Sequence, residues 1–193
     1  MESALKGLFW AVLPGLLFSG CLSPAPPPPK SWMVSVTRNS NSELIVDRVA
    51  RLGSITVAAP YDRPALAVKR RDGSVAFDSF NVFASSPSAL LRAPLAALLE
   101  DDGRFGRVLS SASAARANQT LEAVVTDLSL DCREEGRRIA KVSISIAVME
   151  NREIRMFLDG NGAADATSGD YSAAFSEAFA KAVSEAMKGM PEK

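Results

Sequence analysis

The stretch IAKVSISIAVM at residues 139–149 decides the fold of this chain. Its bulky apolar residues fall on every second position: Val142, Ile144, Ile146 and Val148. Small, polar or charged residues stand between them. Successive side chains of a β-strand point to opposite faces of a sheet, so this period of two predicts a long strand with one apolar face.

Two further strands of the same kind flank this one. Residues 120–132 before it and 153–159 after it also alternate apolar with polar positions. The segments 134–136 and 150–152 supply the turns between the three strands. The pattern predicts an antiparallel meander, with one side of its sheet solvated or covered by helices.

Shorter strands are predicted in the first half of the chain, at residues 32–38, 55–59 and 65–69 and around Val75 and Phe77. The dipeptide Asp72-Gly73 is a strong hairpin signal, because glycine allows the positive φ of a tight turn. The segment 44–52 is ambiguous between helix and strand. Residues 105–109 are expected to form one more strand, and residues 110–118 a loop.

A first amphipathic helix is predicted to begin at Ser86-Pro87 and to run to about Glu100. The serine can cap free N–H groups, and proline at the first helical position loses no hydrogen bond. Pro94 is expected to kink this helix, because proline cannot donate a backbone hydrogen bond.

A second helix is predicted over residues 171–188, with Asp170 as its N-cap and Gly189 at its end. The fold class that follows is α+β. We expect a single domain over residues 32–193, in which two amphipathic helices pack on a mainly antiparallel sheet.

The N-terminus carries a different signal. An apolar run at residues 8–18 is long enough for the core of a signal peptide and shorter than the ~20 residues that a membrane-spanning helix needs. Ser19, Gly20 and Cys21 follow it directly, in the order of a bacterial lipobox. Residues 1–20 are therefore interpreted as a lipoprotein signal peptide. The mature chain would begin at Cys21, modified by acyl chains such as palmitate.

Two simpler interpretations of the N-terminus remain. The leader could be an ordinary secretory signal, with Cys21 as an unmodified thiol, or a hydrophobic helix that packs on the protein. If Cys21 is acylated, several chains at ~0.8 kcal/mol per buried CH₂ would hold the protein on a membrane without a spanning helix.

Residues 21–31 are interpreted as a proline-rich tether. Five prolines stand between Ser23 and Lys30, a composition that favours extended polyproline II. At ~3.1 Å per residue, such a segment would hold the domain roughly 25 to 30 Å from a lipid surface. The alternative is a ligand for a proline-recognition domain.

Composition excludes several function classes. The chain has no histidine, the commonest general base and metal ligand, so catalytic triads and zinc sites are improbable. Lys and Arg number 22, as do Asp and Glu, so no net field favours nucleic acid. With Cys21 acylated, Cys132 has no intramolecular partner and is expected to be a buried small residue. We expect no catalytic residues, no metal and no cofactor beyond the lipid on Cys21.

Two weak site signals have simpler explanations. The sequence Asp159-Gly160-Asn161-Gly162 is similar to the opening of a calcium loop, but the next ligand positions are wrong, so a turn is predicted. The bases at 69–71 could form a phosphate or headgroup patch, although three bases at a hairpin tip are more often explained by solubility.

The order of elements from Pro60-Tyr61-Asp62-Arg63-Pro64 through a strand, the Asp-Gly hairpin, a helix and residues 105–108 resembles the ABC-type transport auxiliary lipoproteins. That family includes the paraquat-inducible protein C type, and the resemblance covers residues 55–188. It implies a periplasmic domain on a lipid anchor, working beside an ABC transporter and a mammalian-cell-entry (MCE) type protein in envelope lipid transport.

The resemblance and the residue types together nominate a partner-binding site at Tyr61, Asp62, Arg63 and Pro64, because tyrosine and arginine are enriched at binding hot spots. A plain structural turn is the competing interpretation. Leu22 follows the cysteine where aspartate favours inner-membrane retention in many bacteria, so the expected location is the outer membrane.

Two rival functions belong to other classes. A structural or assembly lipoprotein could tether some other envelope complex without taking part in lipid transport. A lipid-anchored hydrolase is disfavoured by the absence of histidine and of clustered acids.

Overall fold

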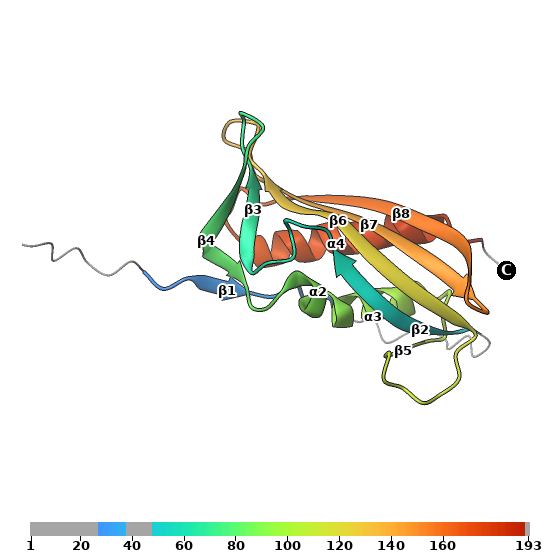
Figure 1. The fold of residues 1–193 in the computed structure, drawn as a ribbon. Helices are drawn as coiled ribbons and strands as arrows, with labels where there is room; N and C mark the ends of the chain where they lie inside the picture. The colour runs from blue at the N-terminus through green and yellow to red at the C-terminus, as the bar shows by residue number, and fades with distance from the viewer. Residues whose placement is uncertain (1–26, 38–47, 192–193) are drawn as a thin grey trace, which may run out of the picture.

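The computed structural model describes residues 27–37 and 48–191. Eight strands form one mixed sheet, and the helices lie along one of its faces (Figure 1). The predicted leader, Cys21, Leu22 and the segment 38–47 lie outside the described residues. No helix of the described ranges is long and apolar enough to cross a bilayer. The α+β class predicted from the sequence is confirmed.

The predicted meander is the longest part of the sheet. It consists of β6 (Gln119–Asp131), β7 (Ile139–Glu150) and β8 (Glu153–Asp165), paired antiparallel in that order. The four alternating apolar residues of β7 that predicted the strand are at most 2% exposed: Val142, Ile144, Ile146 and Val148. The β7–β8 turn is two residues long, and both residues have positive φ: Asn151 and Arg152.

The longest strand pairings of the sheet are antiparallel, as expected, but the sheet also contains parallel pairs and is therefore mixed. Parallel pairs join β2 (Val49–Val57) to both β6 and β5 (Arg107–Leu109). Parallel pairs also join β3 (Ala65–Lys69) to β6, and β1 (Lys30–Trp32) to β4 (Val75–Phe83). The β3–β4 hairpin is antiparallel. The reason for the parallel pairs lies in the connections, because the helical segment after β4 returns the chain so that β6 runs alongside β2 and β3.

The first predicted helix is broken into α2 (Pro87–Leu90) and α3 (Arg92–Asp101), with Leu91 between them. Pro94 has no N–H to donate to the carbonyl of Leu90, so the break falls one turn before the proline. Ser86 holds the N-cap position of α2, but its side chain makes no capping hydrogen bond. The predicted N-cap position is therefore confirmed, but the predicted hydrogen bond from the serine side chain is wrong.

The second helix, α4 (Tyr171–Lys188), has the predicted bounds. Its N-cap is Asp170, whose side chain accepts a hydrogen bond from the backbone N–H of Ala173 at 3.0 Å. α4 lies along β8 and β7 and buries its apolar stripe against them (Figure 1). This helix closes the inner face of the meander.

The predicted turn at residues 159–162 is wrong, because β8 continues to Asp165. Gly160 and Gly162 face α4, and a Cβ on either would overlap the backbone carbonyl oxygen of Ala182 or Ala178, respectively. The two glycines therefore let the helix backbone lie directly on the strand. They mark a close approach, not a turn.

The predicted strand over residues 32–38 is also displaced. The observed strand is β1, which ends at Trp32. Trp32 packs against Phe83 and Phe175, with ring centroids 4.2 and 5.3 Å away. This aromatic cluster joins β1 to both β4 and α4. β1 begins directly after the exposed prolines 27–29.

Candidate functional site

The segment from Ala58 to Pro64 lies at a break in the edge of β6. β2 pairs with β6 as far as Val125, and β3 pairs with the same edge of β6 from Ser129 onward. The backbone N–H of Ala58 still bonds to the carbonyl of Val125 at 2.8 Å. The loop therefore leaves the sheet in the gap between β2 and β3.

Tyr61 is half-buried and packs against the hydrophobic core. The ammonium of Lys69 lies 5.9 Å from the centroid of its ring, within range of a cation–π contact. Among the described residues the Tyr61 hydroxyl has no hydrogen-bond partner. The ring is thus anchored, and the hydroxyl is left for solvent or for a partner.

Asp62 is exposed, and its carboxylate accepts a hydrogen bond from the backbone N–H of Ser88 at 3.0 Å. Ser88 lies in the first turn of α2. Asp62 therefore supplies, from a distant loop, the capping interaction that the side chain of Ser86 does not make.

Arg63 and Pro64 are exposed as well. The guanidinium of Arg63 lies over the ring of Phe77 in β4, 4.2 Å from its centroid. The carbonyl of Pro64 accepts a hydrogen bond from the N–H of Phe83 at 2.8 Å. The structure thus brings the four predicted site residues together on one loop and gives each of them a contact within the domain. Their role in binding a partner stays a prediction.

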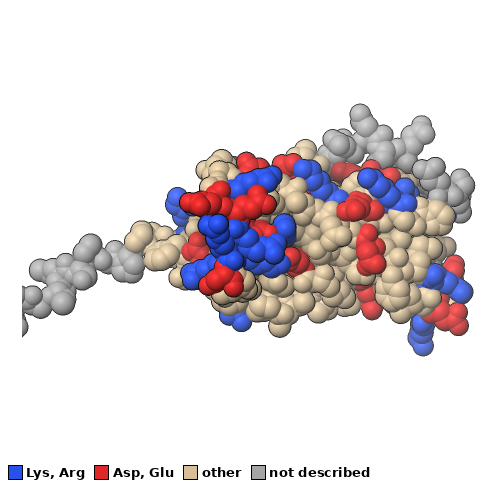
Figure 2. Space-filling view, turned by 90° about the horizontal axis from the view of Figure 1, so that it is seen from above, with Lys and Arg blue, Asp and Glu red and all other residues tan. Residues whose placement is uncertain are grey.

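A cluster of charged residues lies next to this loop, at the end of the sheet formed by the β3–β4 hairpin and the β6–β7 turn. Figure 2 shows acidic and basic side chains gathered at the end of the molecule from which the N-terminal segment leaves. Lys69 links the cluster to the loop, because its ammonium forms an ion pair with Asp127 at 2.5 Å and also lies over Tyr61.

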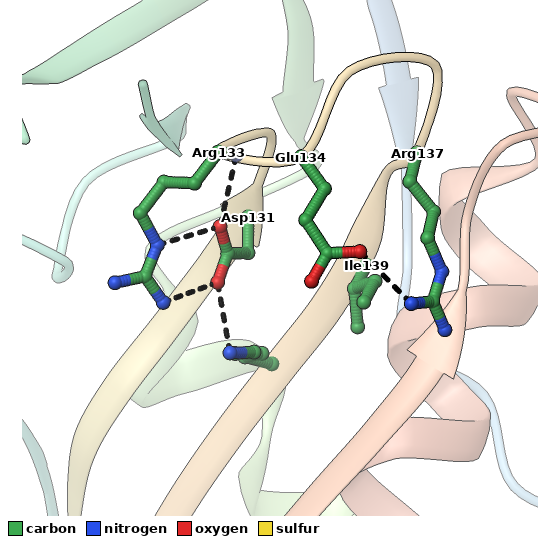
Figure 3. A pocket seen from close by; sticks show the side chains of 6 residues that line it. Asp131, Arg133, Glu134, Arg137 and Ile139 are labelled. Carbon is green, nitrogen blue, oxygen red and sulfur yellow. Dashed lines mark hydrogen bonds and ion pairs between the residues drawn. The ribbon is translucent and has the colours of Figure 1, made fainter. Parts of the chain in front are cut away.

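Asp131 is the centre of the cluster and is only 7% exposed. Its carboxylate accepts hydrogen bonds from Arg133 Nε at 2.9 Å and from a terminal guanidinium nitrogen of Arg133 at 2.6 Å. Lys141 contributes an ion pair at 2.8 Å. These residues, with Glu134, Arg137 and Ile139, line a pocket of about 230 Å³ (Figure 3).

The electrostatics of this pocket favour a fixed ion-pair network. Hydrogen bonds from Arg133, followed by the contribution of Lys141, hold the pKa of Asp131 far below its usual range, against the opposing effect of burial. A carboxylate held ionised in this way is a poor proton acceptor near neutral pH. Glu134 and Arg137 are paired with each other at 2.9 Å (Figure 3). We interpret the cluster as a structural clamp on the β6–β7 hairpin.

No single local sequence pattern indicates this cluster, because its members come from three strands and β3 lies far from the other two in the sequence. The signal in the sequence is the set of polar residues at alternate positions near the end of β6 and the start of β7. Asp131 and Ser129 on β6 face Ile139 and Lys141 on β7 in the antiparallel register. Once that register is known, the charges on the outer sheet face can be paired.

Two other predicted features can be placed. Cys132 is partly buried and free, and burial raises the pKa of its thiol, in keeping with an inert packing residue. Within residues 27–37 and 48–191, no group of three or more His, Cys, Asp or Glu side chains is placed to hold a metal ion.

No family model matches the sequence, and the curated proteins contain no significant match. Solved structures do match. Protein XCC0632 of Xanthomonas campestris, described as a DUF330 protein, has 18% identity and a TM-score of 0.59 over 80% of this chain and 86% of its own. An uncharacterized protein has 11% identity and a TM-score of 0.63 over 86% of this chain and 100% of its own.

A third match is the lipoprotein GNA1162 of Neisseria meningitidis, with 11% identity over 61% of this chain and 83% of its own. Its TM-score of 0.36 is below the level that indicates a common fold. At the identities of the first two matches, the likeness concerns the fold alone. This chain therefore has the same fold as the DUF330 protein of Xanthomonas campestris.

Proposed function

We propose that this protein is a noncatalytic, lipid-anchored auxiliary component of an envelope lipid-transport system of the ABC/MCE type. Its domain would stand in the periplasm on the proline-rich tether, with the acylated Cys21 in the outer membrane. The domain would act by binding a periplasmic partner of the transport machinery. It would carry out no reaction on a substrate.

The observation that carries this proposal is the way the domain is joined to the lipobox. Only eight residues separate Cys21 from Lys30, and the described part of that segment is exposed proline. The chain then enters β1 directly, and Trp32 fixes β1 to Phe83 and Phe175. A short proline-rich segment, of the composition typical of semi-rigid spacers, thus separates the folded domain from the proposed anchor.

Two further observations support the proposal. The sheet-and-helix fold is shared with a DUF330 protein, and the resemblance to the auxiliary lipoproteins spans the same part of the chain. Asp131, the most buried acid of the described residues, is held ionised by Arg133 and Lys141, which suits a structural role better than acid–base chemistry.

The anchor is tested by mass spectrometry of the mature N-terminus. The wild-type chain should begin at Cys21 and carry acyl chains, whereas Cys21→Ala should remain as the uncleaved precursor. Cys132→Ser is the matched control, because it removes the other cysteine and should leave acylation intact. An unmodified mature N-terminus in the wild type would refute the anchor.

The transport role is tested separately, by cross-linking in intact cells followed by purification and protein identification. The expected partners are an MCE-type protein and the components of an ABC transporter. Membrane fractionation should place the protein in the outer membrane. Recovery of a different envelope complex with no transporter component would favour the rival function, a structural or assembly lipoprotein.

A further inference from the structure

The outer strand β8 presents two different edges along its length. It is paired with β7 on one side only, so its other side forms an edge of the described sheet (Figure 1). Unpaired backbone groups on such an edge can pair with another strand. The way each half of β8 is covered therefore decides what can bind there.

The second half of β8 is covered by side chains from α4. Glu185 accepts a hydrogen bond from the backbone N–H of Asn161 at 2.8 Å. Lys181 donates one to the backbone carbonyl of Ala163 at 3.2 Å. These contacts also show that the N–H of Asn161 and the C=O of Ala163 point away from β7, toward the free edge.

The first half of β8 has no such cover among the described residues. The register with β7 is unbroken from Met156 to Asp165, and backbone groups alternate in direction along a strand. The N–H and C=O of Phe157 and Asp159 therefore point to the same free edge as those of Asn161. α4 runs antiparallel to β8 and ends beside Leu158, so it does not extend along the strand toward Ile154.

This open half also exposes apolar surface. Phe157 is 62% exposed and Ile154 is 53% exposed, so two of the most exposed large apolar side chains of the described residues lie three positions apart on this strand. Phe157 lies opposite Ala147, on the outer face of the sheet. The open backbone edge and the exposed aromatic ring thus occur at the same residue.

We propose that this half of β8 binds the same half of β8 in a second copy of the chain. The two strands would run antiparallel about a two-fold axis at Phe157. Each Phe157 would exchange both backbone hydrogen bonds with its counterpart, and the sheets of the two copies would be continuous. The interface is isologous, so a single self-complementary segment is sufficient.

The charges of the segment favour a second copy over an unrelated strand. With Phe157 at the axis, Arg155 of each copy, the extra residue where β8 shifts its register with β7, would come within side-chain reach of Asp159 of the other. Asp159 has no hydrogen bond or ion pair within the described residues. Arg155 is 47% exposed and makes only long contacts of 3.4 Å with Glu150 and Glu153. Two equivalent ion pairs would therefore flank the paired phenylalanines.

The covered half of β8 fixes the register of this pairing. A slip that moved the axis toward Asn161 would require Lys181 and Glu185 to leave the strand edge. A slip that placed the axis at Asp159 would oppose two carboxylates. The pairing about Phe157 avoids both costs.

Disulfide cross-linking in the envelope of intact cells tests the register. In the full chain with Cys132→Ser, the additional change Phe157→Cys should give a disulfide-linked dimer, because Cα atoms of a hydrogen-bonded antiparallel pair are about 5.5 Å apart. Asn161→Cys is the matched control. Its two copies would lie roughly 27 Å apart, eight residue spacings along the strands, and should not cross-link.

The parent chain with Cys132→Ser alone reveals any dimer that forms through Cys21. A folded Phe157→Cys variant that stays monomeric would overturn the proposal. Equal cross-linking at positions 157 and 161 would overturn the register and, with it, the proposed interface.

A charge swap gives an independent test that does not depend on the phenylalanine. In the Phe157→Cys background, Arg155→Glu and Asp159→Arg should each lower the cross-linked fraction. If the two ion pairs together contribute about 1.4 kcal/mol, either change should lower the association constant of the dimer about tenfold. The double variant should restore it. Failure of the double variant to recover, with both single variants folded, would contradict the proposed arrangement.

Discussion

The carboxylate of Asp62 accepts a hydrogen bond from the backbone N–H of Ser88 at 3.0 Å, and this contact joins the 58–64 loop to the first turn of α2. α2 is only four residues long, and the side chain of its N-cap residue, Ser86, makes no capping hydrogen bond. The loop therefore stabilises a helix that begins at Pro87, 23 residues after Pro64. A residue nominated for partner binding thus also has a structural role.

The first prediction concerns this cap. Asp62→Ala should lower the free energy of unfolding by about 1 kcal/mol, because an N–H at the helix start loses its acceptor. Asp62→Asn keeps a side-chain oxygen and should lose less. Urea denaturation of both variants checks the order. Equal stability of Asp62→Ala and the wild type would show that the contact contributes nothing.

The second prediction concerns the contact between β8 and α4. Gly162→Ala should lower the free energy of unfolding by about 3 kcal/mol or more, because the new methyl group would overlap the backbone of α4 at Ala178 and force the helix away. Thermal and urea unfolding measure the loss. Asn161→Ala is the neighbouring control, with its side chain on the exposed face, and should cost much less.

These two contacts show what the sequence could and could not predict. The meander was predictable because Val142, Ile144 and Ile146 report their own burial through a local period of two. Gly160 and Gly162 predict a turn wrongly, because a sequence shows a glycine in the same way whether a turn or a closely packed helix requires it. Only the position of α4 distinguishes the two, and that position is set by the tertiary fold.

The candidate site was predictable in the same partial way. The composition of residues 61–64 indicated a surface loop, and the loop is on the surface. The contacts of Asp62 with Ser88 and of Arg63 with Phe77 join segments far apart in the sequence, so no local pattern contains them. The parallel pairing of β2 and β3 with β6 also joins distant segments, so no local pattern predicts it.

The third prediction concerns Asp131 and pH. The native pKa of this carboxyl lies below its unfolded value of about 3.9, so its contribution to stability is complete above about pH 5 and is lost as the pH falls toward the native pKa. Asp131→Asn should lower the free energy of unfolding at pH 7 by about 1.5 to 3 kcal/mol, because Arg133 and Lys141 lose their acceptor.

Urea unfolding at pH 7 and at pH 3 measures this effect. The difference between the wild type and Asp131→Asn should shrink at the lower pH. There the unfolded wild-type chain binds a proton at Asp131 while the native carboxylate stays ionised, so the ion pairs contribute less to the free energy of unfolding. Glu135→Gln is the control, because its contact with Arg71 is 3.4 Å long and both side chains are at least 80% exposed. A difference that is independent of pH would show that the ionised state of Asp131 is not the source of the stability.

The last prediction separates partner binding from architecture at Tyr61 and Arg63. Tyr61→Ala removes a ring that packs on the core, so it should lower stability as well as any binding, and it cannot decide the question alone. Tyr61→Phe removes only the hydroxyl, which has no partner among the described residues. This variant should keep the melting temperature of the wild type. If the loop is a partner surface, the variant should bind its partner more weakly.

Arg63→Ala complements that variant. It removes a cation–π contact with Phe77 at an exposed site, which should cost about 0.5 to 1 kcal/mol of stability. If Tyr61 and Arg63 are binding anchors, Tyr61→Phe with Arg63→Ala should weaken capture of the cross-linked partner by ~2 kcal/mol, or roughly thirtyfold. Melting curves and quantitative pull-down on the same preparations measure both effects. If the double variant instead melts several degrees lower and still captures its partner normally, the two side chains contribute to stability and not to binding. The loop would then have a structural role only.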